Sequence, residues 1–173
     1  MSKQIRKMSH EGGFSLVEML IVMAISGLII AAIFAVITQT ISVNAANTSH
    51  MEAIKQVENA IHWLDRDSQQ AFRNEIVINN PTLNFPLTLT WTKFGTGDKY
   101  TVIYTFDEAA GVLQRSQSVN SGTPSLTHIA NNISSADYSF NGTILEFELT
   151  SQVNGFKPAS ESRVLYVMPR VGD

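Results

Sequence analysis

Apolar residues are distributed unevenly along the chain and predict one membrane-spanning helix. The 19 residues from Met19 to Ile37 carry no charged side chain. A helix of that length crosses most of the hydrocarbon core of a bilayer. Beyond this block, polar and apolar residues alternate as they do in a soluble domain. We therefore expect a membrane segment at residues 14–37, followed by a soluble part.

A second helical pattern follows the polar, β-branched residues 38–50, in which helix propensity weakens. Apolar and small residues then recur at spacings of three and four, which indicates one face of an amphipathic helix. They are Ile54, Val57, Ile61, Leu64, Ser68, Ala71 and Phe72. We expect helix from Phe14 to about Arg73, with its second half, residues 38–75, packed on its own domain.

From residue 76 the pattern changes to short segments separated by turn residues, which is typical of antiparallel strands. The expected strands are 76–78, 87–92, 100–106, 112–116, 136–140, 143–149 and 162–168. Residues 126–135 are expected to form a short helix or an irregular connection. The predicted fold class is α+β: a long N-terminal helix packed on an antiparallel β-sheet domain formed by residues 76–173.

The first 13 residues, MSKQIRKMSHEGG, are short, polar and basic. A secretory signal carries its small-residue cleavage site after the apolar segment. Here the pair Gly12 and Gly13 precedes that segment. Cutting after Gly13 would therefore leave the whole apolar helix on the mature protein, which predicts a removable leader at residues 1–13.

Glu18 lies at the start of the apolar helix, four residues after Phe14. A carboxylate near the centre of a membrane helix costs roughly 2.5–3.5 kcal/mol on insertion scales, which favours a charged partner. Cutting before Phe14 would create an α-amine one helical turn away, in the same subunit or in a neighbouring one. The alternative is that Glu18 lies at headgroup level and stabilises the helix N-terminus.

The segment GGFSLVEMLIVMAISGLI resembles the prepilin cleavage and methylation motif of type IV pilins and pseudopilins, over about residues 7–40. The resemblance implies a pilin-like fold, cleavage by a prepilin peptidase between Gly13 and Phe14, and N-methylation of the new Phe14 amine. It also implies that Glu18 pairs with the N-terminus of an adjacent subunit during assembly. The implied partners are prepilin peptidase, other pilin or pseudopilin subunits, the inner-membrane assembly platform and membrane lipid.

The strand pattern of residues 100–170 is similar to that of J-type minor pseudopilins and W-type minor pilins, and Arg115 lies where those proteins often carry arginine. This implies a minor subunit that initiates or caps a type IV pilus or a type II secretion pseudopilus. The expected location is the cytoplasmic (inner) membrane, single-pass, with the C-terminal domain extracytoplasmic or in an extracellular or periplasmic filament. The basic leader supports this orientation, because cytoplasmic segments are enriched in Lys and Arg.

Composition narrows the alternatives. The chain has no cysteine, which excludes disulfides, thiolate metal sites and thiol nucleophiles. Removing residues 1–13 leaves 9 basic and 14 acidic residues. No nucleic acid is expected as a partner, because such binding rests largely on neutralising phosphates. The main alternative is a membrane-anchored binding module, such as a DNA-uptake or adhesive minor pilin. A signal-anchored enzyme and an unprocessed single-pass protein are two others.

No residue pattern predicts catalysis, since the sequence contains neither a nucleophile elbow nor a phosphate-binding glycine loop. We therefore expect no enzyme activity and no cofactor. His50, His62 and Asp65 are possible metal-ligand types, but their spacing gives no tight cluster. The segment around Asp98 contains two glycines but lacks the further carboxylates of a calcium-binding loop. We expect it to form a hairpin turn. No metal is expected.

Two further features have structural interpretations. The run Asp65-Arg66-Asp67 is expected on a solvated surface, or as a contact with another subunit of a filament. Trp63 and Trp91 are expected in the core or on the surface of the domain.

Overall fold

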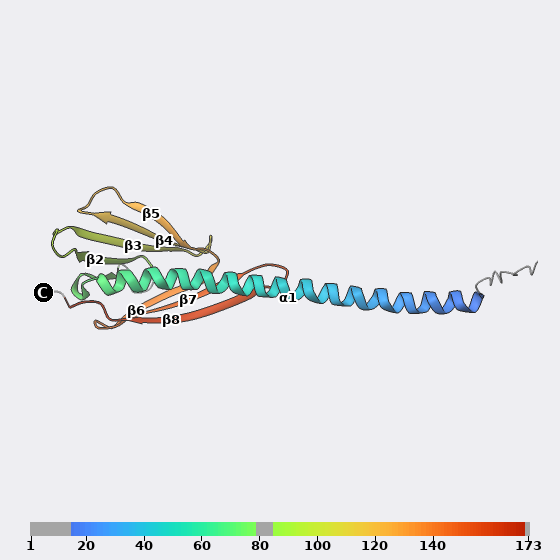
Figure 1. Cartoon of the computed structure of the whole chain (residues 1–173). Coiled ribbons are helices and arrows are strands. Elements are labelled where there is room, and N and C mark those ends of the chain that lie inside the picture. The colour runs from blue at the N-terminus through green and yellow to red at the C-terminus, as the bar shows by residue number, and fades with distance from the viewer. Residues whose placement is uncertain (1–14, 79–84, 172–173) are drawn as a thin grey trace, which may run out of the picture. The chain divides into compact units, whose positions relative to one another are not determined.

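The structure, a computed structural model, describes residues 15–78 and 85–171. Within these residues one long helix, α1 (Leu16–Gln70), is followed by a short 3-10 turn at Arg73–Glu75 and eight strands (Figure 1). The chain forms two compact units that divide after Ser42.

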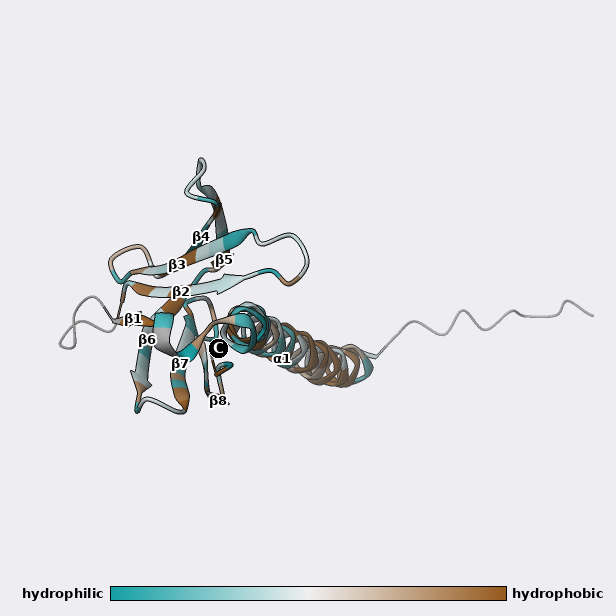
Figure 2. Ribbon diagram, turned by 90° about the vertical axis from the view of Figure 1, so that its left-hand side faces the viewer, coloured by the Kyte–Doolittle hydropathy of each residue, from teal (hydrophilic) through white to brown (hydrophobic). Residues whose placement is uncertain are grey.

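The described residues of the first unit form the N-terminal part of α1, which is apolar and exposed. Every described residue from Ser15 to Ile41 is exposed. Figure 2 shows this part of the helix in the brown of apolar residues, and the second half in mixed colours. The helix is long and apolar enough to cross a membrane. Because its apolar side chains face outward all around, it fits a single-pass membrane anchor.

The helix continues without interruption through residues 38–50, although the polar and β-branched residues there have low helix propensity. Threonine hydroxyls there donate to backbone carbonyls four residues earlier: Thr38 to Phe34 at 3.0 Å and Thr40 to Val36 at 2.9 Å. Thr48 donates in the same way to Asn44 at 2.9 Å. These hydroxyls are satisfied within the helix because they share carbonyl oxygens of its backbone, so they need no partner outside it.

In the second unit α1 packs through the predicted stripe. Val57, Leu64, Ser68 and Ala71 are buried, and Ile54, Ile61 and Phe72 are half-buried. Ala53 and Ala60 on the same side are also fully buried. The predicted α+β fold, in which the second half of the helix packs on antiparallel sheets, is confirmed.

The strands form two antiparallel sheets rather than one. The five-stranded sheet has the order β1-β2-β3-β4-β5, and the three-stranded sheet the order β6-β7-β8. Their bounds are β1 Val77–Ile78, β2 Leu87–Thr92, β3 Lys99–Asp107, β4 Val112–Val119, β5 Ser125–Ala130, β6 Ile133–Phe140, β7 Leu145–Val153 and β8 Ala159–Val167. In Figure 1 the second half of α1 runs alongside both sheets. Buried residues of the helix and of both sheets form one core.

The prediction for residues 126–135 is wrong, because this segment forms β5 and the start of β6. β5 is an edge strand in which Leu126 and His128 are exposed while Ile129 and Ala130 are buried. Because β5 pairs with a neighbouring strand along one edge only, its buried and exposed positions alternate weakly. The chain leaves the first sheet at Asn132, whose φ of 56° is a left-handed conformation that asparagine tolerates.

The C-terminal end of α1 is tied to two distant segments. The Phe72 N–H donates to the Thr90 carbonyl at 2.9 Å, which joins the helix end to β2. The Arg73 N–H donates to the Arg170 carbonyl at 2.8 Å, and the Arg170 N–H donates to the Ala71 carbonyl at 3.0 Å. The end of the helix is therefore fixed by backbone bonds as well as by its apolar face.

Candidate functional site

The N-terminal residues singled out by the sequence are described in part. Gly13 and Phe14 lie outside the described residues. Glu18 lies in the first turn of α1, and its Oε2 accepts a hydrogen bond from the Ser15 backbone N–H at 3.3 Å. A glutamate at the third helical position makes the same contact in a capping box. This contact occupies only one carboxylate oxygen, and Glu18 is exposed.

A cluster of polar side chains lies where α1 meets the five-stranded sheet, and its centre is Asp67. The expectation that the whole run Asp65-Arg66-Asp67 is solvated is wrong for Asp67, which is only 1% exposed. Asp67 lies three residues after buried Leu64, so it shares the helix face that packs on the sheet. Arg66 and Asp65 lie beside that face and remain exposed or half-buried.

Three groups satisfy the Asp67 carboxylate. The Tyr104 hydroxyl donates to Oδ2 at 2.7 Å and Arg115 Nε donates to the same oxygen at 2.5 Å. Arg66 Nη2 lies 3.2 Å from Oδ1. Arg115 is itself 4% exposed, so its ion pair with Asp67 is buried. Burial of both charges is tolerated because each carries several hydrogen bonds.

Strand register places the two sheet residues of this cluster. Tyr104 on β3 and Arg115 on β4 are directly opposite each other. Directly opposite residues of an antiparallel pair point to the same side of the sheet, so both face α1. Arg115 Nη2 also donates to Gln117 Oε1 at 2.7 Å. The sequence contains a signal for this site. Arg115 lies two residues after the apolar Leu113 on the same strand, so both side chains point to the same, buried face of the sheet. A buried arginine needs an acidic partner, which points to a buried carboxylate nearby.

Trp63 provides the aromatic part of the cluster. The guanidinium carbon of Arg66 lies 3.9 Å from the centre of a Trp63 ring, and that of Arg115 lies 4.7 Å away. Both distances are within the range of cation–π attraction. The Trp63 carbonyl oxygen lies 3.0 Å from the Tyr104 hydroxyl oxygen. Helix and sheet are therefore joined by charge, hydrogen bonds and aromatic contact at one point.

Burial raises the pKa of the Tyr104 hydroxyl far above its usual range, and the negative charge of Asp67 adds to this rise. Tyr104 therefore keeps its proton, and stays a hydrogen-bond donor, above the pH at which an ordinary tyrosine loses it. With one carboxylate and two guanidinium groups, the cluster of Asp67, Arg66 and Arg115 carries one net positive charge. Its buried position suits it to fixing the helix on the sheet.

Tyr104→Phe is expected to make the free energy of unfolding less dependent on pH above about pH 10. Above about pH 10 the unfolded chain loses the tyrosine proton while the folded chain keeps it, so wild-type stability falls as pH rises. The wild-type free energy of unfolding should fall by up to about 1.4 kcal/mol per pH unit more steeply than that of the variant. At neutral pH the variant should be less stable by about 1–2 kcal/mol, through the lost hydrogen bond.

Urea unfolding between pH 7 and 11 measures both effects. Tyr100→Phe is the matched control, since it removes a hydroxyl outside the cluster and keeps the ring that stacks on Trp91. The control should follow the steeper wild-type profile. Parallel profiles for wild type and Tyr104→Phe would contradict the assignment.

Within residues 15–78 and 85–171, no group of three or more His, Asp or Glu side chains is placed to hold a metal ion. His50, His62 and Asp65 are thus not gathered into such a group. Asp98 lies after the turn between β2 and β3, where its Oδ1 accepts a hydrogen bond from Asn120 Nδ2 at 2.8 Å. Hydrogen bonds from Asn120 and Thr96 lower the pKa of Asp98, and the charge of Lys93 acts in the same direction.

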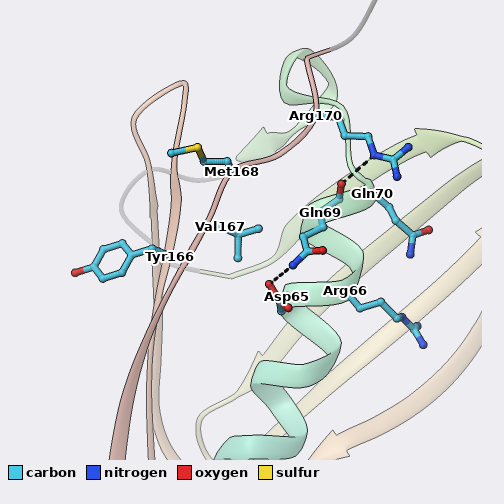
Figure 3. A pocket seen from close by; sticks show the side chains of 8 residues that line it. All are labelled: Asp65, Arg66, Gln69, Gln70, Tyr166, Val167, Met168 and Arg170. Atoms are coloured by element: carbon cyan, nitrogen blue, oxygen red, sulfur yellow. Dashed lines mark hydrogen bonds between the residues drawn. The ribbon is translucent and has the colours of Figure 1, made fainter.

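Two grooves flank the end of α1. The first, of about 680 Å³, lies between the last turns of the helix and the end of β8 (Figure 3). Its polar groups bond to each other: Gln69 Nε2 donates to Asp65 Oδ1 at 2.8 Å, and Arg170 Nε donates to the Gln69 carbonyl at 3.2 Å. The second, of about 350 Å³, lies between the helix and the five-stranded sheet, over the Asp67 cluster. Arg66 and Gln70 line both grooves.

Comparison with known proteins gives one result, at the N-terminus. Residues 8–34 match the family model described as the prokaryotic N-terminal methylation motif. No curated protein and no solved structure matches the chain. The matched segment contains Gly13, Phe14, Glu18 and most of the apolar helix. It supports a type IV pilin-like protein, for which the motif implies processing by a prepilin peptidase and assembly with other pilins.

Proposed function

We propose that this chain is a minor pilin or pseudopilin, a structural subunit that initiates or caps a type IV pilus or a type II secretion pseudopilus. The observation that carries the proposal is the order of features in the motif at residues 8–34: glycine, phenylalanine, glutamate and an apolar helix. The fold supports the proposal. The second half of the long helix packs on the antiparallel sheets, and the exposed first half is available to pack on lipid or on helices of other subunits.

The proposed mechanism begins with cleavage between Gly13 and Phe14 and methylation of the new amine. The mature helix remains in the inner membrane, with the C-terminal domain outside the cytoplasm. Its side chains from Ser15 to Ile41 are exposed in the isolated chain and need cover. Lipid supplies that cover first, and helices of neighbouring subunits replace it, because close packing drives helix association within a membrane. The role is structural and involves no catalysis by this chain.

A second candidate function is a membrane-anchored binding module, such as an adhesive minor pilin. The observations that favour it are three exposed aromatic side chains: Phe94 before β3, Phe156 between β7 and β8, and Tyr166 on β8, which are 101%, 77% and 65% exposed. Aromatic residues are frequent anchors of protein interfaces. The balance of 9 basic and 14 acidic residues in the mature chain argues against DNA as the ligand.

The test is mass spectrometry of the N-terminal peptide from membranes with and without prepilin peptidase. Cyanogen bromide cuts after Met8 and Met19, so the precursor yields residues 9–19 and the mature chain residues 14–19. We expect the shorter peptide, methylated at Phe14, only where the peptidase is present. The peptide of residues 20–23 is released from both forms and measures loading. The longer peptide in both samples would contradict processing and leave an unprocessed single-pass protein.

A further inference from the structure

We propose that the groove over the Asp67 cluster binds a carboxylate-bearing peptide segment of a partner protein. This groove, called the cationic groove below, is formed by α1, β2, β3 and β4. Its volume of about 350 Å³ is enough for one or two side chains of a bound peptide. All of its residues belong to the second compact unit. The proposal therefore does not depend on cleavage after Gly13.

Charge indicates the sign of the ligand. Arg66, Lys93 and Arg115 line the cationic groove together with a single carboxylate, that of Asp67. Asp67 and Arg115 neutralise each other on the floor, where both are buried. Arg66 has a side chain that is 44% exposed, and Lys93 is exposed at the rim. The groove thus presents positive charge on a chain whose mature form carries more acidic than basic residues.

Figure 3 shows how Arg66 is oriented. Arg66 and Gln70 project from α1 on the side away from Met168. The short spacing of four residues between them places both side chains on one helix face. Arg66 contacts Asp67 through Oδ1 only, at 3.2 and 3.3 Å from two of its nitrogens. These long contacts on an exposed side chain leave it able to meet a second carboxylate.

The remaining lining favours a peptide over a bare ion. Tyr100 stacks on buried Trp91, with ring centres 5.6 Å apart and planes 3° from parallel, which gives a rigid aromatic wall. Gln117 Oε1 accepts from Arg115, which fixes the orientation of its amide and leaves the NH₂ group as a donor. Gln70 supplies a second amide. Amides beside an aromatic wall match the backbone and side-chain stem that accompany a carboxylate in a peptide.

An exposed aromatic residue lies next to Lys93 in the sequence, in the turn that leads from β2 to β3. Phe94 follows Lys93 directly and is fully exposed. Water contact by a whole aromatic ring is unfavourable, and burying such a ring is a large term in protein association. The occupant that satisfies both residues is an extended segment in which an acidic residue adjoins an apolar one. Such a segment would place its carboxylate near Arg66 and Lys93 and its apolar side chain on Phe94.

The test uses the full chain in a neutral detergent and a fluorescent, N-acetylated and C-amidated peptide of alternating Leu and Glu. Lys93→Glu should weaken binding about tenfold, because it replaces an attraction by a repulsion at the rim. Lys157→Glu makes the same charge change on the exposed loop between β7 and β8, and should alter the affinity less than about twofold. Thermal unfolding of both variants checks that they fold alike.

Two further measurements separate the possible ligands. A peptide of alternating Leu and Gln should bind at least about tenfold more weakly if the carboxylate is recognised. Glutarate, a small dicarboxylate, should compete only at about 100-fold or higher excess, because it lacks the contacts of a peptide. Equal binding of the Gln peptide, equal affinity for glutarate, or equal loss in Lys93→Glu and Lys157→Glu would each overturn the proposal.

Carbodiimide coupling tests the position of the ligand. The carbodiimide and a proton add to a peptide carboxylate to give an O-acylisourea. The neutral amine of Lys93 attacks its acyl carbon, forms an amide with loss of a proton, and expels the reagent as a urea. We expect the coupled peptide to map to Lys93 in the wild-type chain. Lys93→Arg should bind within about twofold of wild type, since it keeps the charge, but should give no adduct at position 93. Coupling at other lysines only would contradict binding in the cationic groove.

Discussion

Asp67→Asn is expected to lower the free energy of unfolding of the full chain by about 3–5 kcal/mol, because it leaves the buried guanidinium of Arg115 without a counter-charge. The amide oxygen can still accept from Arg115 and Tyr104, but the NH₂ group then faces Arg66, which bonds to the other carboxylate oxygen of Asp67. Urea unfolding in detergent, followed by the fluorescence of Trp63 and Trp91, measures the change. No other substitution proposed here is expected to alter stability as much.

The reciprocal variant should be milder. In Arg115→Met, Asp67 keeps the hydroxyl of Tyr104 and the guanidinium of Arg66. Its cost should therefore be about 1–3 kcal/mol, the range for a buried group that loses one of several partners. The double variant Asp67→Leu with Arg115→Met should recover part of the loss, since an apolar pair replaces a buried ion pair without a stranded charge.

Asp65→Asn is the matched control, two residues earlier on the same helix. Its carboxylate accepts one hydrogen bond from Gln69 at an exposed position. A change within about 0.5 kcal/mol is expected for such a surface site. If Asp67→Asn and Asp65→Asn destabilise the chain equally, Asp67 is not the centre of a buried cluster.

The second large effect is expected from Glu18, and it rests on the proposed function. Glu18→Leu and Glu18→Gln should both be processed to a chain that begins at Phe14, yet both should enter the filament about tenfold less, equivalent to about 1.4 kcal/mol. The reason is that pairing with the N-terminus of an adjacent subunit requires a negative charge. The fraction of the chain in sheared filaments, compared with that left in membranes, measures the effect.

The glutamine variant separates the two roles of Glu18. Its amide oxygen can still accept the hydrogen bond from the Ser15 N–H, so helix capping is retained while the charge is lost. Near-normal assembly of Glu18→Gln together with failure of Glu18→Leu would mean that capping, not charge pairing, is what assembly needs. Glu58→Gln removes a charge at an exposed position of the same helix and should assemble normally.

Elements set by local patterns could be predicted from the sequence. The strand Leu87–Thr92 has the expected bounds, because LTLTWT alternates cleanly and Gly95 and Gly97 end the hairpin in left-handed conformations. The helix was predicted for the same reason, since one apolar block and one stripe follow each other in helical spacing. The methylation motif was also recognised, because its residue order is itself the signal.

Elements set by packing were missed. β5 pairs on one side only and exposes Leu126 and His128, so its sequence lacks the alternation of an inner strand. The chain passes from the first sheet to the second at Asn132, and the sequence there does not differ from that of a turn within one sheet. The charged neighbours of Asp67 predict a solvated position for it. Asp67 is buried because it lies on the same helix face as Leu64 and because Arg115, 48 residues later in the chain, neutralises its charge. A pattern within a few neighbouring residues does not reveal a partner so far away in the sequence.

The backbone bonds between the end of α1 and Arg170 join segments that are synthesised far apart in time. Arg170 Nε and the Gln69 carbonyl are 101 positions apart, and the bonds from Ala71 and Arg73 to Arg170 close a loop of similar length. Contacts between residues so far apart in the sequence form late in folding. The chain must first lose the conformational entropy of closing the long loop, and only then do the contacts stabilise the fold. During synthesis the end of the helix therefore stays exposed until the segment after β8 has been made. Until then the incomplete domain is open to proteases and to exchange with other chains.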